Sequence, residues 1–178
     1  QNADYENERS SVGDSYRAGC ELEGGWAPNQ HWLLQGNITA SQNKIKSYSQ
    51  YSSDNNGTLI LLTYQNTKMA YSPDLIGAGS LTWKPVKPFS LTMTTKYVGE
   101  QFLDNTTNND HKLESYLVQD LRFEWSPSVR GIRQLTLRAA VMNLMDHQYS
   151  SNGYISYGTN YYFPQAGRNF MAGFTVGF

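Results

Sequence analysis

The segment that most constrains the fold is the last one, Tyr161 to Phe178, where apolar residues alternate with small or polar ones. From Phe170 onward every even-numbered position is apolar, and the odd-numbered positions are small or polar apart from Met171. Alternation with a period of two predicts a β-strand with two different faces. A soluble strand of this kind would need a protein core against its apolar face, whereas a membrane-barrel strand needs only lipid there. We therefore expect one strand from Tyr161 to Phe178 with its apolar face in lipid.

Six earlier segments alternate in the same way, and short turns and long polar connections follow each other between them. The sequence therefore predicts seven antiparallel strands. The six earlier strands are expected at residues 17–26, 32–40, 77–84, 89–97, 117–125 and 134–141. We expect loops at residues 1–15, 46–67, 99–113 and 145–160, with at most a local hairpin at 59–64.

The two faces of these strands differ in charge. Within each strand, apolar residues occupy every second position, and every charged residue of the strand centres occupies one of the positions in between. The charged residues are Glu21, Glu23, Lys84, Lys96, Asp120, Arg122, Glu124 and Arg138. On the lipid side of a barrel a Lys or Arg at mid-depth costs ~2–4 kcal/mol. Such a division is therefore typical of a sheet with one face in a membrane.

Aromatic residues are sorted along the strands. Tryptophans flank the short turns, whereas tyrosines gather at the opposite strand ends. The tryptophans are Trp26, Trp32, Trp83 and Trp125. Membrane barrels carry aromatic girdles at both interfaces, and a soluble β-sandwich has no reason to sort Trp and Tyr to opposite ends. The sequence therefore predicts an all-β fold, an antiparallel transmembrane β-barrel segment of about seven strands.

Composition narrows the function classes. The formal net charge is −1, which provides no electrostatic footprint for nucleic acid. The only cysteine, Cys20, excludes a disulfide within the chain. The longest apolar run, Leu59 to Leu62, is far shorter than the ~20 residues of a membrane helix. Membrane barrels also lack long apolar runs, because their strands alternate between apolar and polar residues.

No motif in the sequence indicates catalysis or a metal site. His31, His111 and His147 are scattered, and ligands of a metal site must converge, so we expect them to be solvated loop residues. Residues 54–65 begin like a calcium loop but have Gln65 in place of the bidentate Glu. Nucleophile elbows, phosphate loops and dinucleotide fingerprints do not occur. We predict no enzymatic activity and no cofactor, and we interpret the charged residues of the strands as the lining of a lumen.

Several stretches closely resemble the C-terminal end of TonB-dependent outer-membrane receptors, in particular those of Bacteroides-like bacteria. They are Asn143 to Tyr149, Ser151 to Tyr154 and Tyr162 to Gly173, and the match is extended by Gly13 to Glu21 and Lys96 to Asn105. The resemblance therefore covers nearly the whole chain.

The resemblance implies a barrel of about 22 strands with a plug in its lumen. Residues 1–178 would be the C-terminal part of the transmembrane barrel, and the N-terminal plug would be absent from this chain. An open sheet of seven strands also leaves edge hydrogen bonds that lipid cannot satisfy, so we expect a fragment of a larger barrel.

The function implied by the resemblance is active import across the cell outer membrane by a multi-pass β-barrel. An iron chelate, either a siderophore or haem, is the expected cargo, and cobalamin or a glycan is the next candidate. The implied partners are outer-membrane lipid and lipopolysaccharide, the TonB complex through the plug, the barrel-assembly machinery and the nutrient ligand.

Two alternatives stay open at this stage. One is a small self-contained outer-membrane barrel with a structural, adhesin or lipid-modifying role, which would need an eighth strand that residues 1–15 are too charged and aperiodic to supply. The other is a soluble carbohydrate-binding sandwich, which suits the 13 tyrosines but not the apolar last strand.

Four residues near the C-terminus are candidate site residues. Gly173, Val176 and Phe178 resemble the terminal signal by which barrel-assembly machinery takes up its substrates, through strand addition. Arg168 has the lipid-facing parity at the outer end of the last strand, where it could contact lipopolysaccharide phosphate. The ligand-binding residues are not predicted, although Tyr154 and Tyr157 lie in an outer loop of the kind that contacts cargo in this family.

Overall fold

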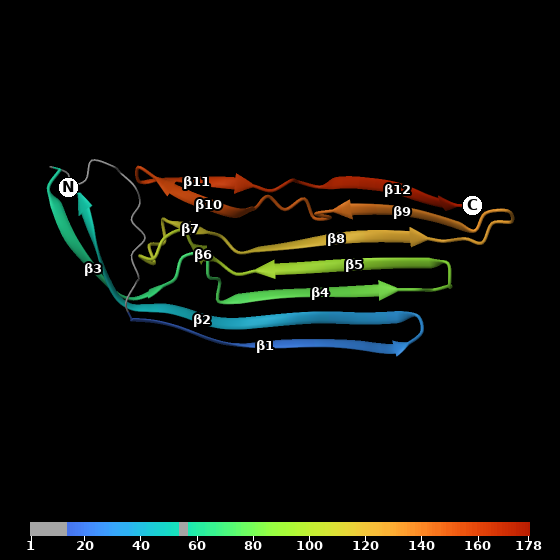
Figure 1. Cartoon of the computed structure of the whole chain (residues 1–178), viewed down its shortest axis with the longest axis horizontal. Coiled ribbons are helices and arrows are strands. Elements are labelled where there is room, and N and C mark those ends of the chain that lie inside the picture. The colour runs from blue at the N-terminus through green and yellow to red at the C-terminus, as the bar shows by residue number, and fades with distance from the viewer. Residues whose placement is uncertain (1–13, 54–56) are drawn as a thin grey trace.

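The structure is a computed structural model that describes residues 14–53 and 57–178, in which every regular element is a β-strand. The main antiparallel sheet has the order β1-β2-β4-β5-β8-β9-β12, and β3 pairs with β2 outside this path. Its strands are β1 (Asp14–Asn29), β2 (Trp32–Ser53), β3 (Leu59–Lys68), β4 (Leu75–Trp83), β5 (Phe89–Val98), β8 (Tyr116–Trp125), β9 (Gln134–Met142) and β12 (Asn169–Gly177). Figure 1 shows the strands side by side, with short turns at one end and long connections at the other. The seven predicted strands are confirmed.

The pairing register keeps the two faces separate across the sheet. Leu81 lies opposite Leu34 on one side and Met93 on the other, and Phe174 lies opposite Leu137. A shift of one residue would turn a whole strand over, so the alternation read from the sequence excludes every register that is displaced by an odd number of residues. Five of the strands, β4, β5, β8, β9 and β12, have 9 or 10 residues, which matches the apolar height of a bilayer.

Within the described residues, no other segment of the chain covers the apolar face of the sheet. Leu22 is 65% exposed, Phe170 72% and Phe174 75%. An apolar surface of this extent marks a face that contacts something other than water. Among residues 14–53 and 57–178 no helix has the length and hydropathy to cross a membrane.

Aromatic rings form a row at the short-turn end of this face. The ring centroids of Trp32 and Trp83 are 6.0 Å apart, Phe89 lies 6.1 Å from Trp83, and Phe123 lies 5.2 Å from Phe89. The predicted tryptophan girdle is therefore present. The tyrosines at the opposite end do not all join a second girdle, because Tyr116 is only 7% exposed.

The loop predicted at residues 46–67 is wrong. β2 continues to Ser53, and β3 returns along it as a hairpin that extends beyond the main sheet in Figure 1. Residues 41–53 lie past the last residue paired with β4 and span about 40 Å at ~3.3 Å per residue. Polar cross-strand pairs replaced the apolar alternation that would have indicated a strand: the rings of Tyr48 and Tyr64 stack at 5.1 Å, and the Ser49 and Thr63 hydroxyls are 2.9 Å apart. The beginning of the calcium-like stretch, residues 54–56, lies outside the described residues.

The single strand predicted from Tyr161 to Phe178 is also wrong in its first part. A separate hairpin, β10 (Ser150–Ser156) and β11 (Thr159–Pro164), occupies most of the loop predicted at residues 145–160, and β12 begins only at Asn169. The hairpin closes through Tyr157 and Gly158, which have φ values of 49° and 74°. Positive φ at both central residues is the geometry of a type I′ turn, and Tyr157 is not a residue that signals it in sequence.

Two smaller boundary differences remain. Asp14 and Ser15 belong to β1 and not to a loop, while residues 1–13 of that predicted loop lie outside the described residues. The predicted loop at 99–113 contains the two-residue strands β6 (Gln101–Phe102) and β7 (Lys112–Leu113).

Candidate functional site

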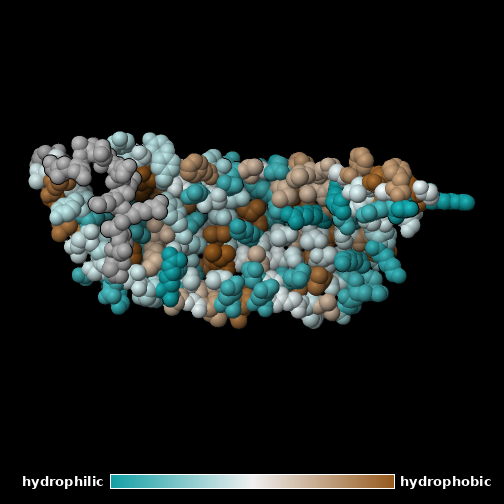
Figure 2. Space-filling view, viewed as in Figure 1, coloured by the Kyte–Doolittle hydropathy of each residue, from teal (hydrophilic) through white to brown (hydrophobic). Residues whose placement is uncertain are grey.

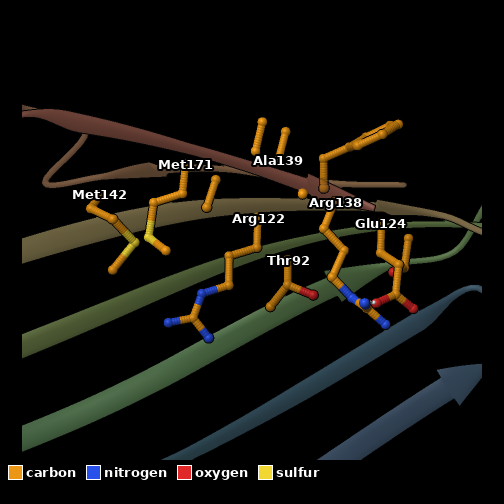
Figure 3. A pocket seen from close by; sticks show the side chains of 12 residues that line it. Thr92, Arg122, Glu124, Arg138, Ala139, Met142 and Met171 are labelled. Carbon is orange, nitrogen blue, oxygen red and sulfur yellow. Dashed lines mark hydrogen bonds and ion pairs between the residues drawn. The ribbon is translucent and has the colours of Figure 1, made fainter. Parts of the chain in front are cut away.

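The polar face of the sheet carries the charges that the alternation predicts. Glu124 of β8 lies opposite Arg138 of β9, and Arg122 lies opposite Thr92 of β5. The Arg138 Nε donates to Glu124 Oε2 at 2.7 Å, and its Nη1 donates to Thr175 Oγ1 at 3.1 Å. Figure 3 shows Arg122, Glu124 and Arg138 projecting from the same side of the strands.

Arg122 is the cation of this cluster that has no acidic partner. Its guanidinium forms no side-chain hydrogen bond or ion pair with the described residues, in contrast to Arg138. A hollow of about 640 Å³ lies beside it, and Met142 and Met171 form part of its lining (Figure 3). The polar face therefore offers one unpaired cation beside a concave surface, which suits contact with a carboxylate or phosphate.

Asn143 joins this face to the long connections. Its backbone N–H donates to Asp120 Oδ1 at 2.9 Å, its Nδ2 donates to the carbonyls of His147 and Ala166, and its Oδ1 accepts from the His147 N–H at 2.9 Å. The residue is 4% exposed and has a φ of 50°, a left-handed conformation that Asn tolerates better than most residues. The end of β9 is thus fixed to the segment that leads to β10.

The buried apolar residues of the described part of the chain lie in the long connections and at the strand ends that adjoin them. They are Ile45, Val98, Phe102, Leu103, Leu113 and Tyr116. The ring of Tyr116 contacts that of Tyr149 at 4.4 Å between centroids. The core of this chain therefore lies at the end of the sheet where the strands meet the long connections.

Hydrogen bonds link segments that are distant in sequence within this unit. Tyr71 Oη donates to the Gly153 carbonyl at 2.9 Å, and the Asn160 Nδ2 donates to the Asp110 carbonyl at 2.6 Å. The Lys68 N–H donates to Thr107 Oγ1 at 2.7 Å. We name these three interlocked connections, residues 66–74, 99–115 and 143–168, the outer-loop unit.

Ion pairs also form within the outer-loop unit. Lys68 Nζ lies 2.8 Å from Asp74, and Lys112 Nζ lies 3.2 Å from Glu100. The hydrogen bond and charge of Glu100 raise the pKa of Lys112. These groups are exposed to solvent, so water and salt screen each pair and its contribution to the stability of the unit is small.

The carboxylate of Asp104 anchors the connection between β6 and β7. Oδ1 accepts from the Thr106 N–H and hydroxyl at 2.8 and 2.6 Å, and Oδ2 lies 2.8 Å from His111 Nδ1. Burial would raise the pKa of Asp104, but the hydrogen bonds of Thr106 and the bond and charge of His111 outweigh burial and lower it. Burial, together with the neighbouring Tyr64 and Asp104, raises the pKa of Tyr48 to about 12.

The histidines do not converge. No group of three potential metal ligands occurs in residues 14–53 and 57–178. His31 Nδ1 lies 2.8 Å from the Lys84 carbonyl at the short turns, while His147 lies at the opposite end with its ring 6.2 Å from that of Tyr149. His111 lies in the connection between β6 and β7, where its side chain is part-exposed and pairs with Asp104.

The residues predicted near the C-terminus lie apart from the outer-loop unit, except at its border. Gly173 and Val176 are in β12 opposite Arg138 and Leu135, and Phe178 follows at 86% exposure. Arg168 directly precedes β12 at the outer end, and its N–H donates to Asp146 Oδ1 at 2.7 Å.

The two tyrosines named as possible cargo contacts lie in the β10–β11 hairpin. The ring of Tyr154 stacks on that of Tyr161 at 5.0 Å, and Tyr157 is fully exposed in the turn. Sequence reasoning missed Asn143 and Asp104 as anchors. For Asn143 a signal existed, since it opens one of the stretches that carry the family resemblance, but nothing local indicated that Asp104 pairs with His111.

Comparison with known proteins decides the family. Residues 1–144 match the family model described as "TonB dependent receptor-like, beta-barrel". The chain belongs to the TonB-dependent receptor family. This receptor segment therefore resides in the cell outer membrane as part of a multi-pass β-barrel, with its apolar face toward lipid. A comparison with curated proteins found no match.

Solved structures share the fold of this receptor segment. The siderophore receptor PiuA from Acinetobacter baumannii superposes with a TM-score of 0.72 at 17% identity, over 89% of this chain and 21% of its own. The ferric yersiniabactin uptake receptor FyuA from Yersinia pestis gives 0.63 at 17% identity, over 89% and 22%. The copper transporter OprC gives 0.59 at 17% identity, over 90% and 24%. This chain thus spans about a fifth to a quarter of the length of these proteins, and the similarity to them establishes its fold.

Proposed function

We propose that this segment belongs to an active outer-membrane importer whose cargo is an iron chelate, either a siderophore or haem, and whose energy comes from TonB. Membership of the TonB-dependent receptor family carries the proposal. PiuA and FyuA, which are named for siderophore and ferric yersiniabactin uptake, support an iron chelate. OprC is named as a copper transporter and has the same fold, so the fold alone does not identify the cargo. An uptake experiment is needed to identify it.

In this proposal residues 1–178 are the C-terminal part of the barrel, and a plug supplied by sequence outside this chain contacts TonB. In the described sheet β1 and β12 each have a single neighbour in the order of strands, so both edges are free for further strands. Because lipid cannot satisfy free edge hydrogen bonds, we infer that additional strands pair with both edges. A complete product close to 20.1 kDa in the outer-membrane fraction would instead favour a small self-contained barrel.

Uptake tests the transport proposal. We expect deletion of the complete gene to abolish energy-dependent accumulation of radioactive iron supplied as a siderophore or as haem, and deletion of TonB to have the same effect. Uptake of cobalamin in the same cells is the control. Unchanged iron uptake with lost cobalamin or copper uptake would reject the iron chelate as cargo while retaining the importer.

We also propose that the segment has no enzymatic role. Glu124 is the carboxylate that lines the hollow, and it is already engaged because it pairs with Arg138. Asp120 of the same strand accepts the Asn143 N–H. Chemical change of the chelate by the purified product would contradict this proposal.

The terminal residues of β12 are proposed to act in barrel assembly, by adding a strand to the assembly machinery. Their exposure supports this role: an added Cβ at Gly173 would meet nothing within 4 Å, and Phe178 is exposed. Deletion of Phe178 should leave most of the product unassembled, as measured by heat modifiability in the outer-membrane fraction, whereas Tyr157→Ala at an exposed turn should assemble normally. Full assembly without Phe178 would reject the proposal.

Arg168 is proposed to contact lipopolysaccharide phosphate. Its backbone is fixed by Asp146, and the residue has the parity of the lipid-facing Phe170. We expect Arg168→Ala to reduce lipid A retention in native mass spectra, with Arg17→Ala on the polar face as the matched control. Equal retention in the two variants would refute the contact.

A further inference from the structure

The short-turn end of the sheet has an unbalanced positive charge. Residues 27–31, 84–88 and 126–133 form its three turns and include four Lys or Arg residues but no Asp or Glu. We name these four residues the cationic rim: Lys84, Lys87, Arg130 and Arg133. All four are exposed, and none forms a side-chain hydrogen bond or ion pair with the described residues.

Three lysines at the opposite end of the sheet have carboxylate partners. Lys46 lies 3.7 Å from Asp14, Lys68 pairs with Asp74, and Lys112 pairs with Glu100. Local carboxylates neutralise those lysines, whereas the cationic rim has no acidic residue on its own turns. The rim therefore needs an anionic partner from outside the chain or leaves its charge to water and salt.

Backbone hydrogen bonds hold the turns of the rim in fixed positions relative to one another. The Lys84 N–H donates to the His31 carbonyl at 2.7 Å, the Ser126 N–H donates to the Pro88 carbonyl at 2.7 Å, and the Arg133 N–H donates to the Gly177 carbonyl at 2.9 Å. In Figure 1 these turns lie at one end of the sheet, and hydrophilic residues extend past that end in Figure 2. The four cations therefore belong to one ordered edge.

Aromatic and apolar residues place this edge at a membrane interface. Lys84 directly follows Trp83 of the aromatic row, and Trp rings sit at the headgroup level of a bilayer. At the tips of two adjacent turns, Val86 is 57% exposed beside Lys87, and Val129 is 40% exposed beside Arg130. An exposed valine next to an unpaired cation suits a headgroup region, where acyl chains begin and phosphates lie.

We propose that the cationic rim, through its turn-tip residues Lys87 and Arg130, binds the phosphates of anionic phospholipids in the periplasmic leaflet of the outer membrane. Short turns face the periplasm in bacterial barrels, so the rim meets phospholipid headgroups on that side. Each Lys or Arg near an anionic lipid surface strengthens binding by about fivefold, and salt weakens the effect. This inference concerns the membrane contact of the segment and does not depend on which cargo is imported.

Lipid retention by the complete gene product tests the proposal. We would purify it in a neutral detergent, add phosphatidylglycerol or phosphatidylcholine, and count retained lipids by native mass spectrometry. In the wild type we expect preferential retention of phosphatidylglycerol. The double variant Lys87→Gln/Arg130→Gln, which removes only the two turn-tip charges, should weaken phosphatidylglycerol binding roughly tenfold or more and leave phosphatidylcholine unchanged.

A matched control removes the same charges elsewhere. Arg17→Gln/Lys96→Gln also removes one Arg and one Lys, both exposed and without a side-chain partner, but on the polar face of β1 and β5. Loss confined to the rim variant supports the proposal. Equal loss in both double variants would mean that net charge alone attracts the lipid, and unchanged binding in the rim variant would mean that the rim serves another partner; either result overturns the proposal.

Discussion

The clearest quantitative test concerns Asn143, the residue that fixes the end of β9 to the outer-loop unit. Replacement by Ala removes three side-chain hydrogen bonds, to the His147 N–H and to the carbonyls of His147 and Ala166. Each bond contributes about 1 kcal/mol net, and Ala at a φ of 50° adds about 1 kcal/mol of strain. Allowing for water that enters the vacated site, Asn143→Ala should destabilise the local structure by about 3 kcal/mol.

Hydrogen exchange measures this local loss directly. In the complete gene product, amides of residues 144–150 should exchange about a hundredfold faster in Asn143→Ala, because 1.4 kcal/mol is tenfold in an equilibrium constant. Asn143→Gly should recover about fivefold of that loss, since Gly relieves the left-handed strain but restores no hydrogen bond.

Asn169→Ala provides the control for Asn143. Its amide group donates to the Gly167 carbonyl at 3.1 Å in an exposed position, so its removal should change exchange in the same region less than threefold. If Asn143→Ala also stayed within threefold of the wild type, the three bonds would not hold the outer-loop unit and the reasoning would be refuted.

Two further predictions concern the assignment of the lipid and polar faces of the sheet and the lowered pKa of Asp104. Leu81→Arg places a cation on the lipid face and should cost ~2–4 kcal/mol in unfolding from lipid vesicles, whereas Ser80→Arg on the polar face should cost under about 1 kcal/mol; equal costs would show that the faces are assigned wrongly. The folded pKa of Asp104 is lowered, so its stabilisation of the β6–β7 connection is present above the ordinary Asp pKa of about 3.9 and is lost as pH falls from there through the folded value. Intrinsically corrected exchange of residues 102–113 should therefore rise below about pH 4 in the wild type and show a weaker pH dependence in Asp104→Asn, and a parallel rise in both would exclude Asp104 as the cause.

The sequence alone determined the membrane-spanning part of this protein. A strand in a sheet with one face in lipid must alternate with a period of two, and a charge on the wrong face is costly, so residues such as Leu81, Arg122 and Phe174 indicate their faces without any knowledge of partners. The tryptophans likewise indicated the level of the short turns. The same constraint narrowed the register, because any shift by an odd number of residues would mix the two faces, and the short turns limit the remaining choices.

Only the tertiary structure decided what happens above the membrane. There the strands of the β2–β3 and β10–β11 hairpins do not alternate between apolar and polar residues: β3 opens with the apolar run Leu59 to Leu62, and the other strands are largely polar or Tyr-rich. The period of two therefore carries no signal, and the pairing depends on contacts such as that of Tyr48 with Tyr64. The anchors Asp104 and Asn143 act on residues from other segments, which no local pattern encodes. Water solvates either arrangement of a polar loop, whereas lipid permits only one arrangement of a spanning strand, and this difference in solvent is why the sequence specified one region and left the other to packing.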